Sequence, residues 1–345
     1  MRHTESCGVS LDVDSLASHT FITGSTGTGK SNVIYQLLSK LKDNSVKFLV
    51  VEPAKGEYKR IFGGICNVYG TNYSKSELLR INPFSFPNGI HVLEHIDRLV
   101  EIFNACWPMY AAMPAVLKDA VEKSYEKVGW NLRNSKCEPL VFPTFADLME
   151  TLPDVMNSSL YSADTKSDYS GALITRVQSL TNGINGQIFC SNRELTVEEL
   201  FEQNVIVDLS RVGSTETKSL LMGIIVMKLQ EYRLHQDKMN SELIHVTVLE
   251  EAHNLLRKTA TGQSQEGANL QGKSVEMLTN SIAEMRTYGE GFIIADQAPA
   301  LLDEAVIRNT NTKIVLRLPD DTDRKLVGTS MALNDNQIIE LAKLP

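Results

Sequence analysis

Eight residues near the amino terminus carry the pattern of a phosphate-binding loop. Residues 24–31 read Gly-Ser-Thr-Gly-Thr-Gly-Lys-Ser, which matches G-x-x-x-x-G-K-[ST]. Glycines let the backbone turn tightly, so that successive N–H groups point at phosphate oxygens. Lys30 would reach the β- and γ-phosphates, and the Ser31 hydroxyl would ligate Mg²⁺. The motif predicts a site for ATP and Mg²⁺ whose nucleotide contacts come from Gly24, Ser25, Thr26, Gly27, Thr28, Gly29, Lys30, Ser31 and Asn32.

The segments on both sides of this loop fit the motif. Residues 19–23 read as a short strand, and residues 32–41 carry apolar side chains at helical spacing. A helix that begins directly after the loop adds its dipole to anion binding. The alternative is a glycine-rich turn that matches by chance. The strand before the loop and the helix after it favour the functional interpretation.

Polar residues at the ends of later strands supply the groups that hydrolysis needs. One apolar run ends in Glu250 and Glu251, of which Glu250 would hold Mg²⁺ and Glu251 would polarise the attacking water. Gln297 follows another run and is predicted to contact that water or the γ-phosphate, because the carboxyl ends of parallel strands face the ligand crevice. Glu52 and Asp208 end two further strands. For each residue, the alternative is an ordinary polar group at a strand end.

One motif favours a different chemistry. His91, Glu94 and His95 form H-x-x-E-H, the inverted signature of zinc peptidases. Both histidines would share one helix face, as zinc ligands must. The alternative is a polar pair on an amphipathic helix, and no third ligand stands out later in the chain. A zinc peptidase is therefore the weaker hypothesis.

The order of the elements predicts an α/β fold. Strands alternate with helices, which indicates a parallel sheet that is covered on both faces. We expect strands at 19–23, 48–52, 204–209, 243–249, 291–295 and 313–318. We expect helices at 32–41, at 90–129 with breaks at Pro108 and Pro114, at 145–152, at 218–235, and in a segment that ends at Met285. Loops are expected at 154–170 and, as a mobile segment, at 258–273. The predicted division is a first core part at 1–80, a mostly helical insertion at 81–160 and a second core part at 161–345.

The composition of the 345 residues narrows the class of protein. The formal net charge of −8 argues against a protein that coats DNA with its whole surface, although it permits a local basic lining. The five cysteines are scattered, odd in number and never form C-x-x-C, which argues against a disulfide framework or a zinc cluster. No apolar run is as long as a membrane span. We therefore expect a cytoplasmic protein that does not bind membranes.

Six segments, taken together and in order, resemble the HerA branch of the HerA/FtsK superfamily. They are residues 24–31, 51–58, 205–210, 249–254, 285–289 and 295–299. The resemblance covers nearly the whole chain. It implies a RecA-like P-loop NTPase core, a homo-oligomeric ring of six subunits and ATP-driven translocation on double-stranded DNA. It also implies an effector partner, either a nuclease or, in anti-phage defence, a nuclease or a sirtuin-type NADase.

The resemblance also assigns roles to single residues. It makes Lys30 the lysine of the phosphate loop, Glu251 the general base and Gln297 the sensor of the γ-phosphate. Glu52 falls where the family carries an acid near the nucleotide. Arg286 falls where the family has an arginine that can reach the ATP of a neighbouring subunit.

The sequence departs from the family pattern in three places. Glu250 stands where Asp is usual, which leaves direct Mg²⁺ ligation open. About twenty residues precede the phosphate loop, where the family often carries a β-barrel, and the chain stops at Pro345, where such proteins usually continue. We expect either a core fragment or a short member of the family.

Contact with DNA is expected from basic loops rather than from the acidic exterior. The candidates are Lys55, Lys59 and Arg60 after the second strand, and Arg257, Lys258 and Lys273 around the predicted mobile loop. Their contacts would be to phosphates and independent of base sequence. The alternative is that each is an ordinary solvated cation.

The residues and the resemblance together predict an ATP-hydrolysing, ring-forming motor that translocates double-stranded DNA. The alternative is an ATP-gated oligomeric scaffold that assembles or activates an effector protein without processive motion. Stimulation of the ATPase by long duplex DNA would distinguish the motor from the scaffold.

Overall fold

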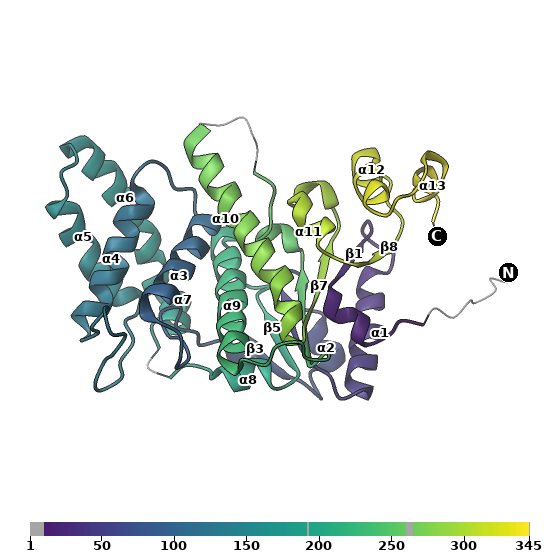
Figure 1. Ribbon diagram of the computed structural model, residues 1–345, viewed down its shortest axis with the longest axis horizontal. Helices are drawn as coiled ribbons and strands as arrows, with labels where there is room; N and C mark the ends of the chain where they lie inside the picture. The colour runs from purple at the N-terminus through teal and green to yellow at the C-terminus, as the bar shows by residue number, and fades with distance from the viewer. Residues whose placement is uncertain (1–9, 192, 260–264, 345) are drawn as a thin grey trace.

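The computed structural model describes residues 10–191, 193–259 and 265–344, and the side chains of residues 265–269 lie outside that description. In these residues the chain forms an eight-stranded sheet in the order β4-β3-β5-β2-β6-β7-β1-β8 (Figure 1). All neighbouring strands are parallel. The strands are β1 (Thr20–Thr23), β2 (Lys47–Glu52), β3 (Asn67–Gly70), β4 (Glu77–Leu78), β5 (Val205–Asp208), β6 (His245–Glu250), β7 (Glu290–Asp296) and β8 (Thr312–Val315). The predicted α/β fold with a mostly parallel sheet is confirmed.

Helices connect the strands along the whole chain. The α-helices are α1 (Lys30–Asp43), α2 (Tyr58–Phe62), α3 (Val92–Cys106), α4 (Met113–Lys127), α5 (Phe145–Ser158), α6 (Ala163–Thr181), α7 (Gly183–Phe189), α8 (Val197–Phe201), α9 (Thr215–Gln236), α10 (Gln265–Glu284), α11 (Glu304–Arg308), α12 (Asp321–Ser330) and α13 (Asp335–Glu340). Short 3₁₀ helices are η1 (Asp14–Ser18), η2 (Ala252–Asn254), η3 (Met285–Tyr288) and η4 (Pro299–Leu301).

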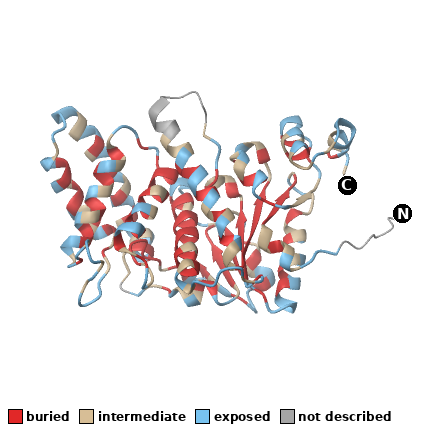
Figure 2. Ribbon diagram, viewed as in Figure 1, coloured by how far each residue is buried: buried red, intermediate tan, exposed pale blue. Residues whose placement is uncertain are grey.

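The sheet is buried on both faces, which explains why its central strands are apolar without interruption. In β2, Phe48 and Val50 pack into a core that includes residues of α1 and α2. The alternate residues Leu49 and Val51 pack into a larger core with residues of α3, α9 and α10. Successive side chains of a strand point to opposite faces, so a strand between two cores needs apolar residues at every position. Figure 2 shows this buried band through the sheet and α9.

The segment from Val92 to Phe201 is helical and lies in the chain between β4 and β5. Figure 1 shows α4, α5 and α6 together at one end of the molecule, opposite α12 and α13. Helix α5 begins as predicted, because Thr144 forms a capping box with Asp147. The boundaries at residues 80 and 160 stay a prediction.

Three local predictions were wrong. The segment 154–170 is mostly helical, since α5 continues to Ser158 and α6 begins at Ala163, where Ser162 accepts a hydrogen bond from the backbone N–H of Thr165. Pro114 does not break a helix but lies at the second position of α4, where its missing N–H costs nothing.

The third wrong prediction is the mobile loop at 258–273, because α10 begins at Gln265. The sequence of its first turns is polar and therefore resembled a loop. Its later apolar residues Val275, Leu278 and Ile282 are buried. Residues 260–264 lie outside the described residues. Among the helices that the structure describes, none is long and apolar enough to cross a membrane.

Candidate active site

The phosphate loop connects β1 to α1 at the edge of the sheet where β1 ends. Gly29 immediately precedes α1 with a φ of 99°, a left-handed conformation that favours glycine. Gly24 lies against the residue after β8, so that a Cβ there would come within 2.7 Å of the Leu316 Cβ. The loop therefore needs small residues for backbone reasons, independently of any ligand.

Lys30 is the first residue of α1, and its side chain is only 8 % exposed. Its ammonium group has no hydrogen-bond partner among the described residues, and the Glu251 carboxylate lies 3.9 Å away. Burial lowers the pKa of this amine, because it disfavours the charged form. A buried ammonium without an acceptor is costly, and phosphate oxygens are the acceptors that would satisfy it.

A cavity of about 210 Å³ opens in front of the phosphate loop. We call it the nucleotide cavity. It is lined by Ser25, Thr26, Gly27, Gly29, Lys30, Ser31, Asn32, Lys55 and Gln297. Seven of these nine residues are in the predicted nucleotide-binding set. Gln297 directly follows β7, the strand next to β1, and Lys55 comes from the loop after β2.

Glu251 contacts both Lys30 of the phosphate loop and Gln297, the residue after β7. It follows β6 directly and has a left-handed φ of 46°, which is uncommon for a residue with a side chain. The Nε2 amide of Gln297 donates a hydrogen bond to its carboxylate. The Oε1 of the same amide accepts a hydrogen bond of 2.6 Å from the Thr26 hydroxyl. Gln297 thus bridges the phosphate loop and the predicted base.

Glu250 is the last residue of β6 and is 7 % exposed. Its carboxylate accepts a hydrogen bond of 2.6 Å from the Tyr58 hydroxyl. Burial raises the pKa of Glu250, because it disfavours the charged carboxylate. A cation bound beside it would favour the ionised form. A serine hydroxyl and a carboxylate are oxygen ligands of the kind that Mg²⁺ takes. The donor types of Ser31 and Glu250 therefore fit the ion that the sequence predicts.

The acids at the ends of β2 and β5 hold the loops beside them. Glu52 accepts hydrogen bonds from the backbone N–H groups of Glu57 (2.7 Å) and Tyr58 (3.3 Å). Burial raises the pKa of Glu52 to about 7. Asp208 pairs with Lys59 and accepts a hydrogen bond of 3.0 Å from the backbone N–H of Ser210. Glu52 is not among the described residues that line the nucleotide cavity, and its role near the nucleotide stays a prediction.

The sequence analysis assigned no role to His253 or to Asp296. Asp296 is completely buried at the end of β7 and accepts hydrogen bonds from the backbone N–H (2.8 Å) and the Nδ1 (2.9 Å) of His253. The hydrogen bond to Asp296 raises the pKa of His253. Its Nδ1 lies 3.7 Å from the Glu251 carboxylate. Asp296 therefore positions a protonatable ring beside the predicted base. The signal in the sequence was the spacing Glu-x-His after a buried strand.

Arg286 lies in η3, immediately before β7, and is exposed. The start of β7 is at the edge of the sheet opposite to the one where the phosphate loop lies. A surface ion pair with Glu284 or Glu290 would give this arginine a purely structural role. Glu290 instead pairs with His245 and Arg233, and Arg286 forms no ion pair among the described residues.

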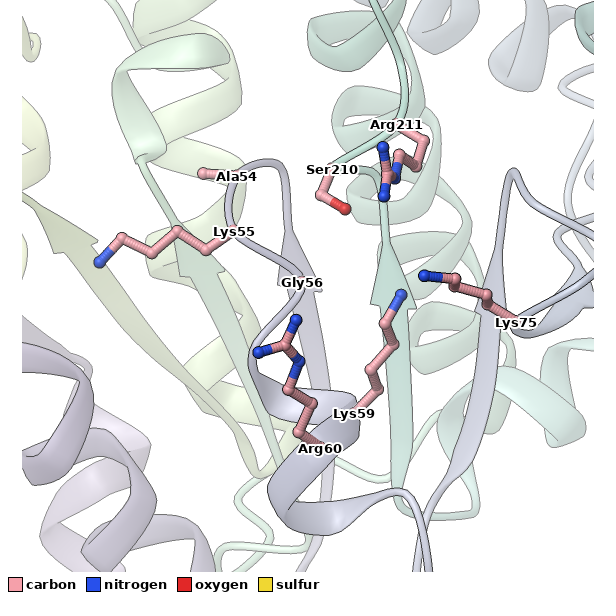
Figure 3. A pocket seen from close by; sticks show the side chains of 8 residues that line it. All are labelled: Ala54, Lys55, Gly56, Lys59, Arg60, Lys75, Ser210 and Arg211. Carbon is pink, nitrogen blue, oxygen red and sulfur yellow. The ribbon is translucent and has the colours of Figure 1, made fainter.

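The two groups of predicted DNA contacts differ in how they are placed. Lys55, Lys59 and Arg60 line one pocket, together with two cations that were not predicted, Lys75 and Arg211 (Figure 3).

The second predicted group is more scattered. Lys258 pairs with Glu304 at 2.7 Å. Arg257 is exposed beside a backbone bridge to Leu302, and Lys273 is exposed on α10 rather than on a loop.

The residues of the H-x-x-E-H motif do not converge on a metal. His91 caps α3 by accepting a hydrogen bond of 3.2 Å from the backbone N–H of Leu93. His95 is completely buried and contacts Glu231 at 2.9 Å. In the part of the chain that the structure describes, the one group of side chains with metal-ligand geometry is Glu251, His253 and Asp296. The zinc-peptidase hypothesis therefore has no support in the geometry.

Comparisons with known proteins identify the family of the chain. Residues 2–229 match the family model described as "Helicase HerA, central domain". Two curated proteins named DNA double-strand break repair helicase HerA are 21 % identical over 344 residues (Sulfurisphaera tokodaii) and 23 % identical over 341 residues (Saccharolobus solfataricus). Each alignment covers 97 % of this chain but only 62 % and 61 % of the respective relative. The chain thus spans about three fifths of the length of these relatives.

Solved structures share the fold. The structure of VirB4 of Thermoanaerobacter pseudethanolicus aligns with a TM-score of 0.70 and 18 % identity, over 94 % of this chain and 84 % of that one. Plasmid coupling protein TrwB in complex with ADP and Mg²⁺ aligns with a TM-score of 0.63 and 11 % identity, over 96 % of this chain and 82 % of that one. The expected RecA-like P-loop NTPase fold is confirmed. Since the family match spans well over half of its residues, the chain belongs to the HerA helicase family, whose central domain it carries.

Proposed function

We propose that the chain is an ATPase that uses hydrolysis to move double-stranded DNA through a homo-oligomeric ring, with six subunits as the expected number. The observation that carries this proposal is the arrangement of Lys30, Glu251 and Gln297 around one cavity at the ends of β1, β6 and β7. The two curated relatives are named as DNA repair helicases, which supports DNA as the substrate. The solved structure of TrwB is a complex with ADP and Mg²⁺, which supports the nucleotide and the ion.

Each part of the hydrolysis is assigned to a side chain of the site. Lys30 binds the β- and γ-phosphates and neutralises their charge. Glu251 accepts a proton from water while the water oxygen forms a bond to the γ-phosphorus and the bond to the bridging oxygen of ADP breaks. Gln297 orients Glu251 through one hydrogen bond and couples it to the phosphate loop through a second hydrogen bond, with Thr26. Ser31 and Glu250 would hold Mg²⁺, which would supply positive charge against the charge that develops on the phosphates.

Two further roles follow from placement and from the family. Arg286 is too far from the nucleotide cavity of its own chain, so we assign it to the ATP of a neighbouring subunit. The family resemblance supports an effector protein as a partner, a nuclease or an NADase, with DNA repair and anti-phage defence as the two settings. Glu52 acts as the support of the loop that carries Lys55 rather than as a nucleotide contact.

The test compares ATP hydrolysis with and without long duplex DNA. A motor is expected to hydrolyse ATP faster with duplex DNA and to displace a bound third strand in an ATP-dependent way. Lys30→Ala protein controls for contaminating ATPases. Hydrolysis that ignores DNA but rises with a partner protein would instead identify the ATP-gated scaffold.

A further inference from the structure

A second cavity, of about 640 Å³, lies beside the nucleotide cavity at the same edge of the sheet. It is lined by Ala54, Lys55, Gly56, Lys59, Arg60, Lys75, Ser210 and Arg211. These residues come from the loop and helix after β2, the turn before β4 and the turn after β5. Figure 3 shows Lys59, Lys75 and Arg211 pointing toward one another from different segments. We call this cavity the basic pocket.

The charges of the basic pocket are not balanced by the protein. Five of its eight lining residues are cationic, and none is acidic. Asp208, which is buried and does not line the pocket, neutralises Lys59. The other four cations form neither an ion pair nor a side-chain hydrogen bond among the described residues: Lys55, Arg60, Lys75 and Arg211. In a chain of net charge −8, such a group of like charges is a local positive field that attracts anions.

The walls of the basic pocket are anchored. The loop after β2 is held by Glu52, which accepts hydrogen bonds from two of its backbone N–H groups. Gly56 lies so close to the turn after β5 that a Cβ there would come within 3.0 Å of the Ser210 Oγ, and its φ is 66°. Asp208 fixes both Lys59 and the backbone of Ser210. The segments after β2 and β5, which carry most of these cations, are therefore held in place by hydrogen bonds and close packing.

The types of the side chains indicate the anion. Two guanidinium groups, Arg60 and Arg211, can each form paired hydrogen bonds with phosphate oxygens, and lysines add point charges. Cations from three separate segments suit several phosphates in a row better than one isolated ion. Side chains of this kind bind a sugar–phosphate backbone without reading its bases.

We propose that the basic pocket binds consecutive backbone phosphates of DNA, and that Lys75 and Arg211 complete a contact surface of which the sequence showed only Lys55, Lys59 and Arg60. This assignment takes its phosphate source from the proposed function. Lys55 lines both the basic pocket and the nucleotide cavity, so the backbone would lie directly beside the bound nucleotide.

The experiment measures binding of a fluorescent 30-base-pair duplex by anisotropy, without nucleotide and over a range of salt concentrations. The test variant is Lys75→Ala with Arg211→Ala, and Lys75→Glu with Arg211→Glu is a stronger version. The matched control is Lys47→Ala with Lys238→Ala, which removes two exposed lysines at the opposite edge of the sheet. Thermal unfolding shows whether each variant is folded.

For the test variant we expect weaker binding and a plot of log K against log salt that is flatter by about 2, roughly one unit for each lost phosphate contact. The control is expected to keep the affinity and the slope of the wild type. A wild type that binds duplex DNA while the folded test variant keeps both values would overturn the pocket assignment alone. A wild type that binds no duplex DNA would overturn the proposed function as well.

A second measurement separates a DNA backbone from free phosphate. Inorganic phosphate is titrated by calorimetry against the wild type and the test variant at matched ionic strength. We expect no difference between the two proteins. Phosphate binding that is lost in the variant, with an unchanged salt slope for DNA, would overturn the proposal and assign the basic pocket to a small phosphate ligand.

Discussion

The side-chain amide of Gln297 donates a hydrogen bond to the Glu251 carboxylate and accepts one from the Thr26 hydroxyl. One residue at the end of β7 therefore connects the phosphate loop to the predicted base at the end of β6. The position of the carboxylate therefore depends on the loop that is predicted to bind the nucleotide, which is the connection that a nucleotide-dependent enzyme needs.

Glu251→Gln is expected to stop hydrolysis while ATP binding persists. The amide oxygen can still accept the hydrogen bond from Gln297, but it cannot accept the proton of the attacking water. Loss of a general base typically lowers kcat by about 10²–10⁴-fold. Steady-state hydrolysis and nucleotide binding are measured side by side, with Glu304→Gln as a surface control. Hydrolysis at a near wild-type rate would remove Glu251 as the base.

Lys30→Ala is expected to abolish both ATP binding and hydrolysis. The substitution removes the buried ammonium whose hydrogen bonds are unmet in the described residues. The matched control is Lys40→Ala on the same helix, whose exposed side chain pairs with Asp43 at 3.5 Å. Equilibrium binding of a fluorescent ATP analogue checks the result, and binding by the Lys30 variant as tight as by the wild type would contradict it.

Much of the site could be predicted because its motifs fix local geometry. The phosphate loop needs glycine at set positions, and an apolar run that ends in acid marks the end of a buried strand. The other contacts of the site depend on which strands lie side by side. The register of β6 with β7 pairs Glu250 with Ala295, and this brings Asp296 next to the residues that follow Glu250. The contact of His253 with Asp296 follows from this register, which a single sequence does not specify.

The basic pocket shows the same limit. Lys55, Lys59 and Arg60 are neighbours in the chain, and they were found together. Lys75 and Arg211 join them only because β3 pairs with β5, which in turn pairs with β2. The helix α6 was missed for a different reason, since its polar first turn resembles a loop until the later apolar residues Leu173 and Val177 are packed.

Glu52→Gln is expected to change how stability depends on pH. Burial raises the pKa of this carboxyl from 4.5 to about 7 in the folded state. Between these values the folded chain binds more protons than the unfolded chain, so the contribution of Glu52 to stability falls as pH rises, and the penalty is complete above pH 7. Glutamine carries no such penalty and can still accept a hydrogen bond from the loop.

The measurement is urea unfolding of the wild type and Glu52→Gln between pH 4.5 and 8. The free energy of unfolding of the variant, relative to the wild type, is expected to rise across this range by up to about 3 kcal/mol. Glu77→Gln, at an exposed position in β4, is the control and is expected to give a constant difference. A constant difference for Glu52→Gln would show that folding does not raise the pKa of the Glu52 carboxyl.

Arg286 is expected to act on the nucleotide of a neighbouring subunit. It precedes β7, whereas the phosphate loop lies beyond the other end of that strand, about 20 Å away at 3.3 Å per residue. An arginine near the γ-phosphate neutralises charge in the transition state, and a well-placed one raises the rate by about 10³–10⁵-fold. Arg286→Ala is therefore expected to lose hydrolysis but to keep ATP binding.

Mixing two inactive proteins tests the trans arrangement. In a ring made from Glu251→Gln and Arg286→Ala subunits, some interfaces combine an intact base from one subunit with an intact arginine from its neighbour. Activity should return in part, because both groups are then present at one nucleotide. Arg133→Ala, in the turn between α4 and α5, replaces Arg286→Ala in the control mixture and tests for effects of subunit exchange. If mixed rings form, as shown by differently tagged subunits, and activity stays absent, Arg286 does not complete the neighbour's site.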